Sequence, residues 1–207
     1  GVTSVALTSV LPQDGDNNDP VYAEDHDYRD GTLPPIRRFK SISPGYIAAI
    51  GSRLIAGRDL TWNETFQKAP VALVSENLAR EWWRGPRAAI GKRIRPTPKD
   101  DWREIIGVIA DLRDDGVDQK APAIAYWPLI QNNFESRGIE SIRSVAILVR
   151  TTRAGSTSLL RDLRQAVASV NPNLPLASVR TLQSIYDRSL ARTSFTLLLL
   201  TIAGGMA

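Results

Sequence analysis

The sequence predicts a mixed α+β fold, because segments with the two-residue repeat of strands and segments with a helical repeat both occur along it. A strand followed by a helix is expected near each end of the chain, and a strand-rich block is expected between them. Hydrophobic residues make up 43% of the 207 residues, enough for a substantial core, and charged residues make up 23%, which argues against general disorder.

The N-terminal part is expected to supply two strands separated by a long loop. Residues 2–11 are rich in Val, Thr and Leu and partly alternate, as strands do. Residues 12–35 are acidic and crowded with turn formers, which predicts a loop. Residues 36–42 alternate again and predict the second strand.

A short helix is expected over residues 45–50. Ser43 can cap its N-terminus, and Pro44 suits the first helical position because its φ angle is already helical. Gly51 is placed to end this helix, since glycine readily adopts the left-handed conformation found after helix ends.

The middle of the chain is expected to consist mainly of strands. Gly107 is expected to mark a bulge, and Pro128 suggests an edge position, because proline cannot donate a hydrogen bond to a neighbouring strand. The expected strands in this block lie at residues 53–57, 70–75, 90–95, 102–110 and 124–130.

One helix is expected within this block, over residues 76–83, with Ser75 as its cap. Leu78 and Trp82 lie four residues apart, so they share a face that we expect to be buried. Trp83 points elsewhere, and we expect it to be exposed, where aromatic side chains favour protein interfaces.

The C-terminal third predicts a strong strand over residues 144–151 and the clearest helix of the chain over residues 158–170. A short strand at 176–180 and a final helix capped by Thr181 are expected to follow. The apolar residues of the clearest helix form one stripe: Leu159, Leu163, Ala166, Val167 and Val170.

The order of elements suggests two subdomains. Residues 1–52 and 141–192 would form an outer α+β layer, and residues 53–140 would form a strand-rich insertion. Residues 193–207 contain no charged residue and are largely apolar. This run is shorter than the roughly 20 residues of a membrane span, so it predicts either the start of a transmembrane helix or a buried terminal helix.

Composition excludes several classes of site. The net charge is +4, but the basic residues are dispersed, so no nucleic-acid partner is expected. The chain has no cysteine, which excludes disulfides, cysteine zinc sites and cysteine nucleophiles. The glycine-containing segment at 51–57 lacks the Gly-Lys-Ser/Thr ending of a phosphate-binding loop, so no nucleotide site is implied.

No catalytic residue, metal ligand or cofactor-binding residue is expected. His26 is the only histidine and lies among carboxylates, without a partner nucleophile in the pattern. Three alternate residues resemble the start of a calcium loop, but Asp19 stands where that loop needs glycine. The three residues are Asp14, Asp16 and Asn18. A solvated acidic loop is therefore favoured, and calcium binding by this loop stays an open alternative.

Four residues are candidates for contact with a partner protein. Three of them lie in the acidic loop, where aromatic and acidic side chains alternate, and the fourth lies at the end of the expected helix over 76–83. The four candidates are Asp25, His26, Tyr28 and Trp83.

The sequence resembles the MacB-like periplasmic core domain of FtsX-like ABC transporter permeases. The resemblance covers nearly the whole chain except the acidic loop, and its strength lies in the shared order of motifs that are weak individually. The motifs are Ser-Pro-Gly-Tyr at 43–46, Leu-Ile-Ala-Gly-Arg-Asp-Leu at 54–60, Pro-Val-Ala-Leu-Val-Ser-Glu-Asn-Leu-Ala-Arg at 70–80, Ile-Gly-Lys-Arg-Ile at 90–94, Ile-Gly-Val-Ile-Ala-Asp at 106–111, Ala-Tyr-Trp-Pro-Leu at 125–129 and Asn-Pro-Asn-Leu-Pro at 171–175.

This resemblance implies a porter-like α+β subdomain with an inserted strand-rich subdomain. Within this family, the sequence is most similar to the second extracytoplasmic domain of large permeases with duplicated halves, of the type found in acidobacteria. The implied function is to transmit ATPase-driven motion to a substrate or partner outside the inner membrane, with no enzymatic activity in this domain. ATP would be bound by a separate cytoplasmic ABC ATPase, reached through the membrane helices.

The implied location is the periplasmic side of the inner membrane, with the domain tethered to it. The implied partners are an adaptor protein, a lipoprotein or a cell-wall hydrolase, and a second copy or internal repeat of the same domain. The alternative to this reading is a soluble extracytoplasmic module that binds ligands or peptides, or acts as a sensor.

Overall fold

The computed structural model describes residues 1–14, 17–28, 32–116, 118–131 and 144–190, and it confirms the α+β fold. In this part of the chain ten strands form one mixed sheet, whose main path runs β10-β1-β4-β9-β6-β8-β7-β3, with β2 beside β4 and β5 beside β8. The strands are β1 (Val2–Thr8), β2 (Asn18–Pro20), β3 (Tyr22–Ala23), β4 (Ile36–Ile42), β5 (Leu54–Gly57), β6 (Val71–Ser75), β7 (Arg93–Arg95), β8 (Arg103–Ile109), β9 (Ile124–Pro128) and β10 (Ala146–Thr151).

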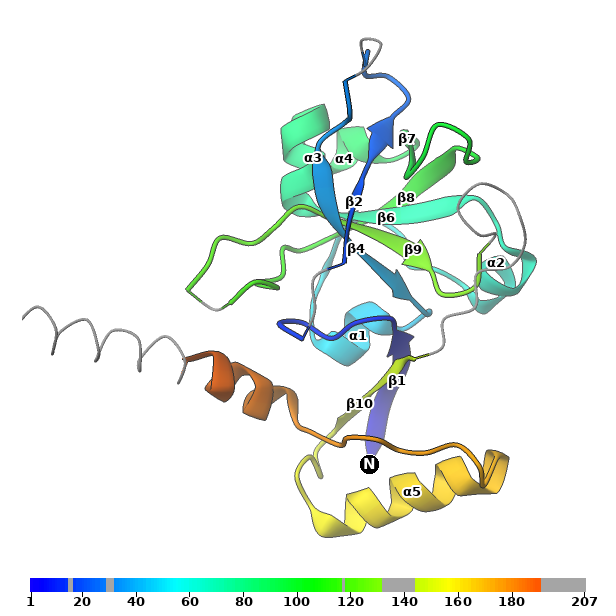
Figure 1. Cartoon of the computed structure of the whole chain (residues 1–207), viewed down its shortest axis with the longest axis vertical. Helices are drawn as coiled ribbons and strands as arrows, with labels where there is room; N and C mark the ends of the chain where they lie inside the picture. Colours follow the sequence, from blue (N-terminus) through cyan, green and yellow to red (C-terminus); the bar gives the residue numbers. More distant parts are fainter. Residues whose placement is uncertain (15–16, 29–31, 117, 132–143, 191–207) are drawn as a thin grey trace, which may run out of the picture.

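The helices cover and flank this sheet (Figure 1). Helices α3 and α4 pack beside the β6–β8 region, α1 packs against β1 and β10, and α5 lies at the end of the molecule where the N-terminus is found. The helices are α1 (Tyr46–Ile50), α2 (Trp62–Gln67), α3 (Glu76–Trp83), α4 (Pro86–Ala89) and α5 (Thr157–Val170).

The central strands are buried on both faces, so the sheet separates two hydrophobic cores. Along β6, Leu73 points into one core and Val74 into the other, because successive side chains of a strand point to opposite faces. The same alternation places Tyr126 and Trp127 of β9 in different cores. The first core also takes in α1, and the second takes in α3 and α4.

Strands β1 and β10 form an antiparallel ribbon that is joined to the rest of the sheet at one point. Six residue pairs connect β1 to β10, whereas only Thr8 and Ile42 pair β1 with β4. Beyond that point β4 pairs in parallel with β9 over five residues. The sheet is thus continuous through both predicted subdomains, and the proposed boundaries at 52/53 and 140/141 stay a prediction.

Several expected elements are confirmed. β4 has the predicted bounds 36–42, and α3 has the predicted bounds 76–83. Gly51 ends α1 in the left-handed conformation, with φ of 78°. The side chain of Thr181 accepts a hydrogen bond from a backbone N–H of the helix over residues 182–190, as a cap does.

The two predicted serine caps are not formed by the serine side chains. The hydroxyl of Ser43 accepts a hydrogen bond from the Leu7 N–H at 2.8 Å, and that of Ser75 accepts one from the Ile124 N–H at 2.9 Å. Both hydroxyls therefore accept hydrogen bonds from backbone N–H groups of strands, and not from the N–H groups at a helix N-terminus. The carboxylate of Asp111 supplies the missing cap on α3, accepting from the Asn77 N–H at 2.8 Å.

The edge position predicted from Pro128 is wrong, because β9 lies between β4 and β6. On the β6 side, pairing involves only Ala125 and Tyr126, so the neighbouring strand does not require a hydrogen bond from Pro128. On the β4 side the parallel ladder continues through Leu129, whose N–H donates to the Ile42 carbonyl at 2.9 Å. A proline is tolerated at the end of this central strand for that reason.

The acidic segment 12–35 is not entirely loop, since it contains β2 and β3. β2 pairs with β4, and β3 pairs with β7, so this segment crosses from one part of the sheet to another. The strand expected at 176–180 is absent from the described residues. The capped helix α2 was not expected at all, although Thr61 and Glu64 have the spacing of a capping box.

The apolar stripe expected on α5 is only partly buried. Leu159 is buried, and Leu163 and Val167 are half-buried along the same face. Ala166 is exposed, and Val170 is 84% exposed, so the stripe fades toward the end of the helix.

The bulge expected at Gly107 is confirmed, since the pairing of β6 with β8 skips one residue immediately before it. A Cβ atom at this position would lie 2.3 Å from the Arg58 carbonyl oxygen, a distance that real Cβ atoms do not reach. Glycine therefore lets β5 and its following residue approach β8 closely.

Gly107→Ala should reduce the free energy of unfolding by roughly 1–3 kcal/mol, because backbone must move to make room for the methyl group. Chemical denaturation followed by circular dichroism would measure this. Gly85→Ala is the matched control, because a Cβ atom there meets nothing within 4 Å. Equal midpoints for the two variants would contradict the close approach.

Candidate partner-contact site

The turn after β3 is attached to the end of α3 through one carboxylate, that of Asp25. Its two oxygens lie 3.0 and 3.1 Å from the Trp83 Nε1, which donates to them. The ammonium of Lys92 lies 2.8 Å from the same carboxylate, and the Nδ1 of His26 lies 3.1 Å away. We call this group of four residues the Asp25 cluster.

The Asp25 carboxylate is strongly stabilised in its ionised form. Partial burial alone would raise its pKa, but hydrogen bonds from Lys92, Trp83 and His26, together with the charge of Lys92, outweigh that effect and lower the pKa to about 2. The Asp25 carboxylate therefore stays ionised at any pH near neutrality.

Aromatic rings surround His26. Its ring centroid lies 5.4 Å from that of Trp82, 6.2 Å from that of Trp83 and 6.4 Å from that of Tyr28. The Tyr28 hydroxyl accepts a hydrogen bond from the Ala23 N–H at 3.0 Å, which closes the turn back onto β3. Partial burial raises the pKa of Tyr28 above its usual value.

The structure thus brings together all four predicted contact residues, although one expectation about them is wrong. Trp83 was expected to be exposed, but it is 7% exposed, while Trp82 is only half-buried. The reason is that two separate segments cover α3: Leu78 packs into the core beside the sheet, and the turn after β3 covers Trp83, whose Nε1 donates to Asp25. Helical periodicity alone shows the face of α3 but not which distant segment covers it. Contact of these residues with a partner stays a prediction.

An open groove of about 840 Å³ lies beside this site. It runs between α3 and the residues that lead into β4 and β9, and its charged lining residues are four basic side chains and one acidic one. Arg37 packs over the Trp82 ring at 5.7 Å and pairs with Glu81, while Arg38 pairs with Asp115 at 2.6 Å. The charged and amide residues of the wall are Asn18, Arg37, Arg38, Asn77, Arg80, Glu81 and Lys120.

A buried ion pair that sequence analysis missed joins Lys40 of β4 to Asp114. The two side chains are 0% and 2% exposed, and the Nζ lies 2.9 Å from a carboxylate oxygen. The Nζ also lies 3.5 Å from the carbonyl oxygens of Val10 and Leu11, which follow β1. Burial lowers the pKa of Lys40 and raises that of Asp114, and the attraction between the two opposes both shifts.

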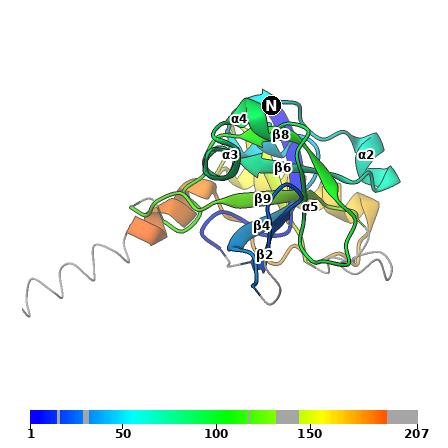
Figure 2. The same ribbon diagram turned by 90° about the horizontal axis from the view of Figure 1, so that it is seen from above.

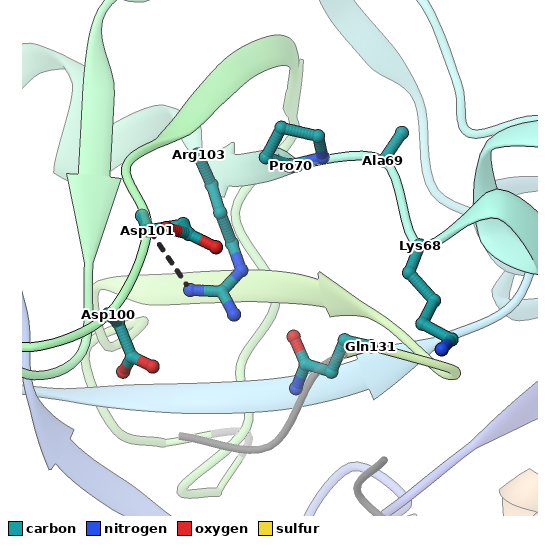
Figure 3. Close-up of a pocket in the computed structure, with 7 residues that line it drawn as sticks. All are labelled: Lys68, Ala69, Pro70, Asp100, Asp101, Arg103 and Gln131. Carbon is teal, nitrogen blue, oxygen red and sulfur yellow. Dashed lines mark hydrogen bonds between the residues drawn. The ribbon is translucent and has the colours of Figure 1, made fainter. Parts of the chain in front are cut away.

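A second, small cavity is polar and closed by charged residues (Figure 3). Its volume is about 20 Å³, which is room for one water molecule and not for a metabolite. In Figure 3 the Arg103 guanidinium lies between Asp101, whose carbonyl it contacts at 3.4 Å, and Gln131. This cavity is therefore a structural feature of the turn before β8.

The described residues include no group of three or more His, Cys, Asp or Glu side chains placed to hold a metal. Of the residues that resemble a calcium loop, Asp14 pairs with Arg180 at 2.6 Å and Asn18 belongs to β2. Asp16 lies outside the described residues. No helix among the described residues is apolar and long enough to span a bilayer, and the predicted membrane segment 193–207 lies outside them.

Comparison with known proteins identifies the fold. No protein-family model and no curated protein sequence matches the chain. Among solved structures, the periplasmic region of MacB from Actinobacillus actinomycetemcomitans matches with a TM-score of 0.52 at 14% identity, over 82% of this chain and 67% of that one. A domain of a putative permease from Porphyromonas gingivalis matches with a TM-score of 0.53 at 21% identity, over 86% and 74%.

The chain has the fold of the MacB periplasmic region. The extracellular domain of the noncanonic ABC-type transporter YknZ from Gram-positive bacteria shares this MacB-like fold, with a TM-score of 0.50 at 16% identity over 83% of this chain and 78% of that one. The resemblance drawn from the order of motifs in the sequence is thereby confirmed at the level of the fold.

Lys92→Met should raise the pKa of Asp25 from about 2 toward its ordinary value of 3.8, because the nearest cation is removed. A lowered pKa in the folded state stabilises that state above pH 3.8, and this contribution is lost as the pH falls toward about 2. Carbon-13 NMR of the Asp25 carboxyl carbon would follow the titration. Lys99→Met, at an exposed lysine elsewhere, is the control; an unchanged Asp25 pKa in Lys92→Met would refute the assignment.

Proposed function

We propose that this chain is the extracytoplasmic domain of an ABC transporter permease and that it transmits motion from the membrane to a substrate or partner protein. The observation that carries the proposal is the shared fold with domains from three bacterial proteins described as MacB, a permease and an ABC-type transporter. A shared fold alone is an argument by analogy, so the geometry of the chain must also suit the task.

The arrangement of the two chain ends supports this proposal. β1 begins at residue 2, and β10 and α5 come late in the chain, yet all three lie together at one end of the molecule (Figure 1). The ribbon of β1 and β10 meets the main sheet through the single pair Thr8–Ile42. A force applied to β1 and β10 would therefore reach the main sheet through this pair and through α1, which packs against both strands.

The buried pair of Lys40 and Asp114 reinforces that junction. Lys40 contacts the carbonyls of residues 10 and 11 as the chain leaves β1. The helix over 182–190 lies at the same core, since Leu182 packs against it and Ile185 is buried. Burial and the charge of Asp114 raise the pKa of Tyr186 on this helix. The segment that follows β1 and the helix over 182–190 thus pack against the same core, beside this pair.

In this proposal the domain performs no chemistry of its own. A separate cytoplasmic ABC ATPase binds and hydrolyses ATP, and membrane helices carry the motion to this domain on the periplasmic or extracellular side. The partner outside the membrane would be an adaptor, a lipoprotein or a hydrolase, or a second copy of the domain. The Asp25 cluster and the neighbouring groove are the surfaces that we assign to such contacts.

A second candidate function is a module that binds anionic ligands or peptides. The observation that favours it is the open basic groove of about 840 Å³ beside α3. All three arginines of its wall are already paired with carboxylates, which leaves less charge for a ligand, so we place this function second.

The motion can be measured by spin-label distances in the full-length permease reconstituted with its ATPase. Because this chain has no cysteine, Val170→Cys on α5 and Ala88→Cys on α4 would carry the only labels in the domain. We expect ATP to shift the distribution of distances between them. The control pair, Asn63→Cys with Ala88→Cys, lies within the main body and should not shift; identical distributions with and without ATP for the first pair would contradict the proposal.

A further inference from the structure

Helix α5 carries two arginines on the side that faces away from the body. Leu159 of this helix is buried, and Arg161 lies about 200° further round the helix, on the opposite side. Arg164 follows three residues later and therefore lies beside Arg161. Both arginines are exposed, and no carboxylate of the described residues pairs with either of them.

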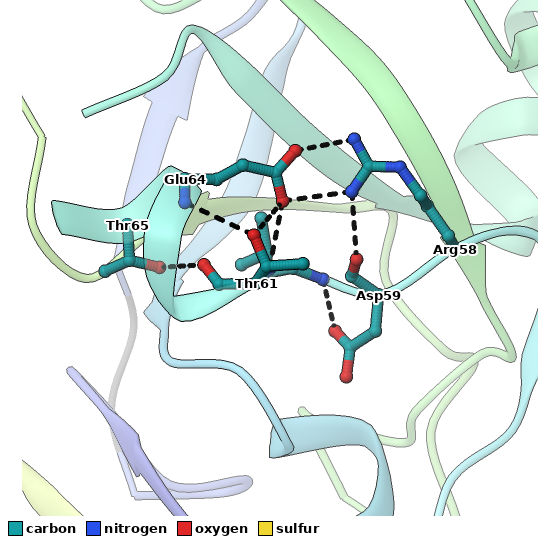
Figure 4. A network of polar contacts seen from close by, with 6 residues as sticks. Arg58, Asp59, Thr61, Glu64 and Thr65 are labelled. Atoms are coloured by element: carbon teal, nitrogen blue, oxygen red, sulfur yellow. Dashed lines mark hydrogen bonds and ion pairs between the residues drawn. The ribbon is translucent and has the colours of Figure 1, made fainter. Parts of the chain in front are cut away.

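An arginine of α2 shows how such a charge is compensated elsewhere in this chain. In Figure 4 the Arg58 guanidinium donates to both Glu64 oxygens, at 2.9 and 2.5 Å. On α5 the one carboxylate is that of Asp162, and it lies 2.8 Å from Arg153. The two outward-facing arginines of α5 therefore keep their full positive charge for a partner.

The end of the molecule that holds α5 is poor in carboxylates. Residues 1–13, which include β1, contain no charged side chain. Between residues 144 and 180, which include β10 and α5, Asp162 is the single acidic residue. The basic residues of the same stretch are Arg150, Arg153, Arg161, Arg164 and Arg180, of which Arg180 pairs with Asp14. This balance makes this end complementary to an anionic surface.

Helix α5 is the outermost element at this end of the molecule. In Figure 1 it lies next to the start of β1, and α3 and α4 lie at the opposite end. In the view from above, Figure 2 shows α5 beneath the sheet. The neighbouring groove of the Asp25 cluster and the small polar cavity are lined by other segments, so neither reaches α5. An exposed, charged helix face without a groove suits a flat partner better than a peptide.

Exposed apolar side chains at the same end favour a lipid surface over a free phosphate ion. Val170, the last residue of α5, is 84% exposed, and Leu174 is 55% exposed. Free phosphate would require only the cations, whereas the interface of a bilayer also accepts apolar side chains.

We propose that the Arg161–Arg164 face of α5 rests on the anionic lipid headgroups of the membrane that holds this domain. The two guanidinium groups would donate hydrogen bonds to lipid phosphates, and the apolar side chains at the end of α5 would enter the interface. The inference rests on the proposed function for one step, that a bilayer lies beside this end of the domain. Two arginines give a weak contact, which is sufficient for a domain already held at the membrane.

A dye whose emission depends on its surroundings, attached at Ala168→Cys, tests this proposal. Ala168 is exposed and lies one turn after Arg164, and the chain has no other cysteine. The 207-residue chain is titrated with vesicles of phosphatidylglycerol and phosphatidylethanolamine, and separately with vesicles of phosphatidylcholine and phosphatidylethanolamine. We expect a blue shift with the anionic vesicles and a much smaller one with the neutral vesicles. The same dye at Ala88→Cys on α4 should show no such difference.

Two double variants with the same loss of charge locate the contact. Arg161→Gln with Arg164→Gln should weaken binding to the anionic vesicles by at least about ten-fold, because each basic residue at such a surface contributes roughly five-fold. Arg84→Gln with Arg87→Gln is the matched control, since both arginines are exposed and lie at the α3–α4 end of the molecule. This control should bind the vesicles almost as the unaltered chain does.

Four results would overturn the proposal: equal blue shifts with the two kinds of vesicle, equal weakening by the two double variants, the same shift with soluble glycerol phosphate, or the same shift with polyglutamate. The last two would show a site for free phosphate and a surface for an acidic protein, respectively. Binding to vesicles requires neither the ATPase nor motion, so failure of the lipid contact can be told from failure of the proposed function.

Discussion

The buried contact between Lys40 and Asp114 is the constraint on which the arrangement of the chain ends depends. Removing two charges from water is costly unless they meet each other and further polar groups, so each side chain holds the other in place. Lys40 belongs to β4, Asp114 follows β8, and the carbonyls that Lys40 contacts follow β1. The Lys40–Asp114 pair therefore holds three separate segments together, next to the helix over 182–190.

That buried pair adds to the packing of α1 against β1 and β10, which also connects the ribbon to the body. The β1–β10 ribbon meets the main sheet through one residue pair, whereas the strands beyond it are buried on both faces and form a stiff body. A stiff body connected through the β1–β10 ribbon is expected to move as a rigid unit when the ribbon is displaced. The proposed transmission of motion depends on this junction, and the MacB-like fold shows the fold alone.

Local patterns in the sequence were sufficient where neighbours along the chain decide the structure. The bounds of β4 and α3 and the bulge at Gly107 follow from alternation, helical spacing and the absence of a side chain. Features decided by distant segments were missed: Trp83 is covered by the turn after β3, and Lys40 finds Asp114 more than seventy positions away. The candidate contact residues were recognised from their chemistry, but the Asp25 carboxylate that joins Trp83 to Lys92 could be found only in the structure.

A double-mutant cycle across Lys40 and Asp114, with the free energy of unfolding measured by chemical denaturation, tests the central constraint most directly. We expect Lys40→Met alone and Asp114→Leu alone each to cost about 3–5 kcal/mol, because each leaves one buried charge unpaired. The double variant should cost much less than the sum of the two. Additive losses would contradict the claim that this pair fixes the chain ends to the sheet.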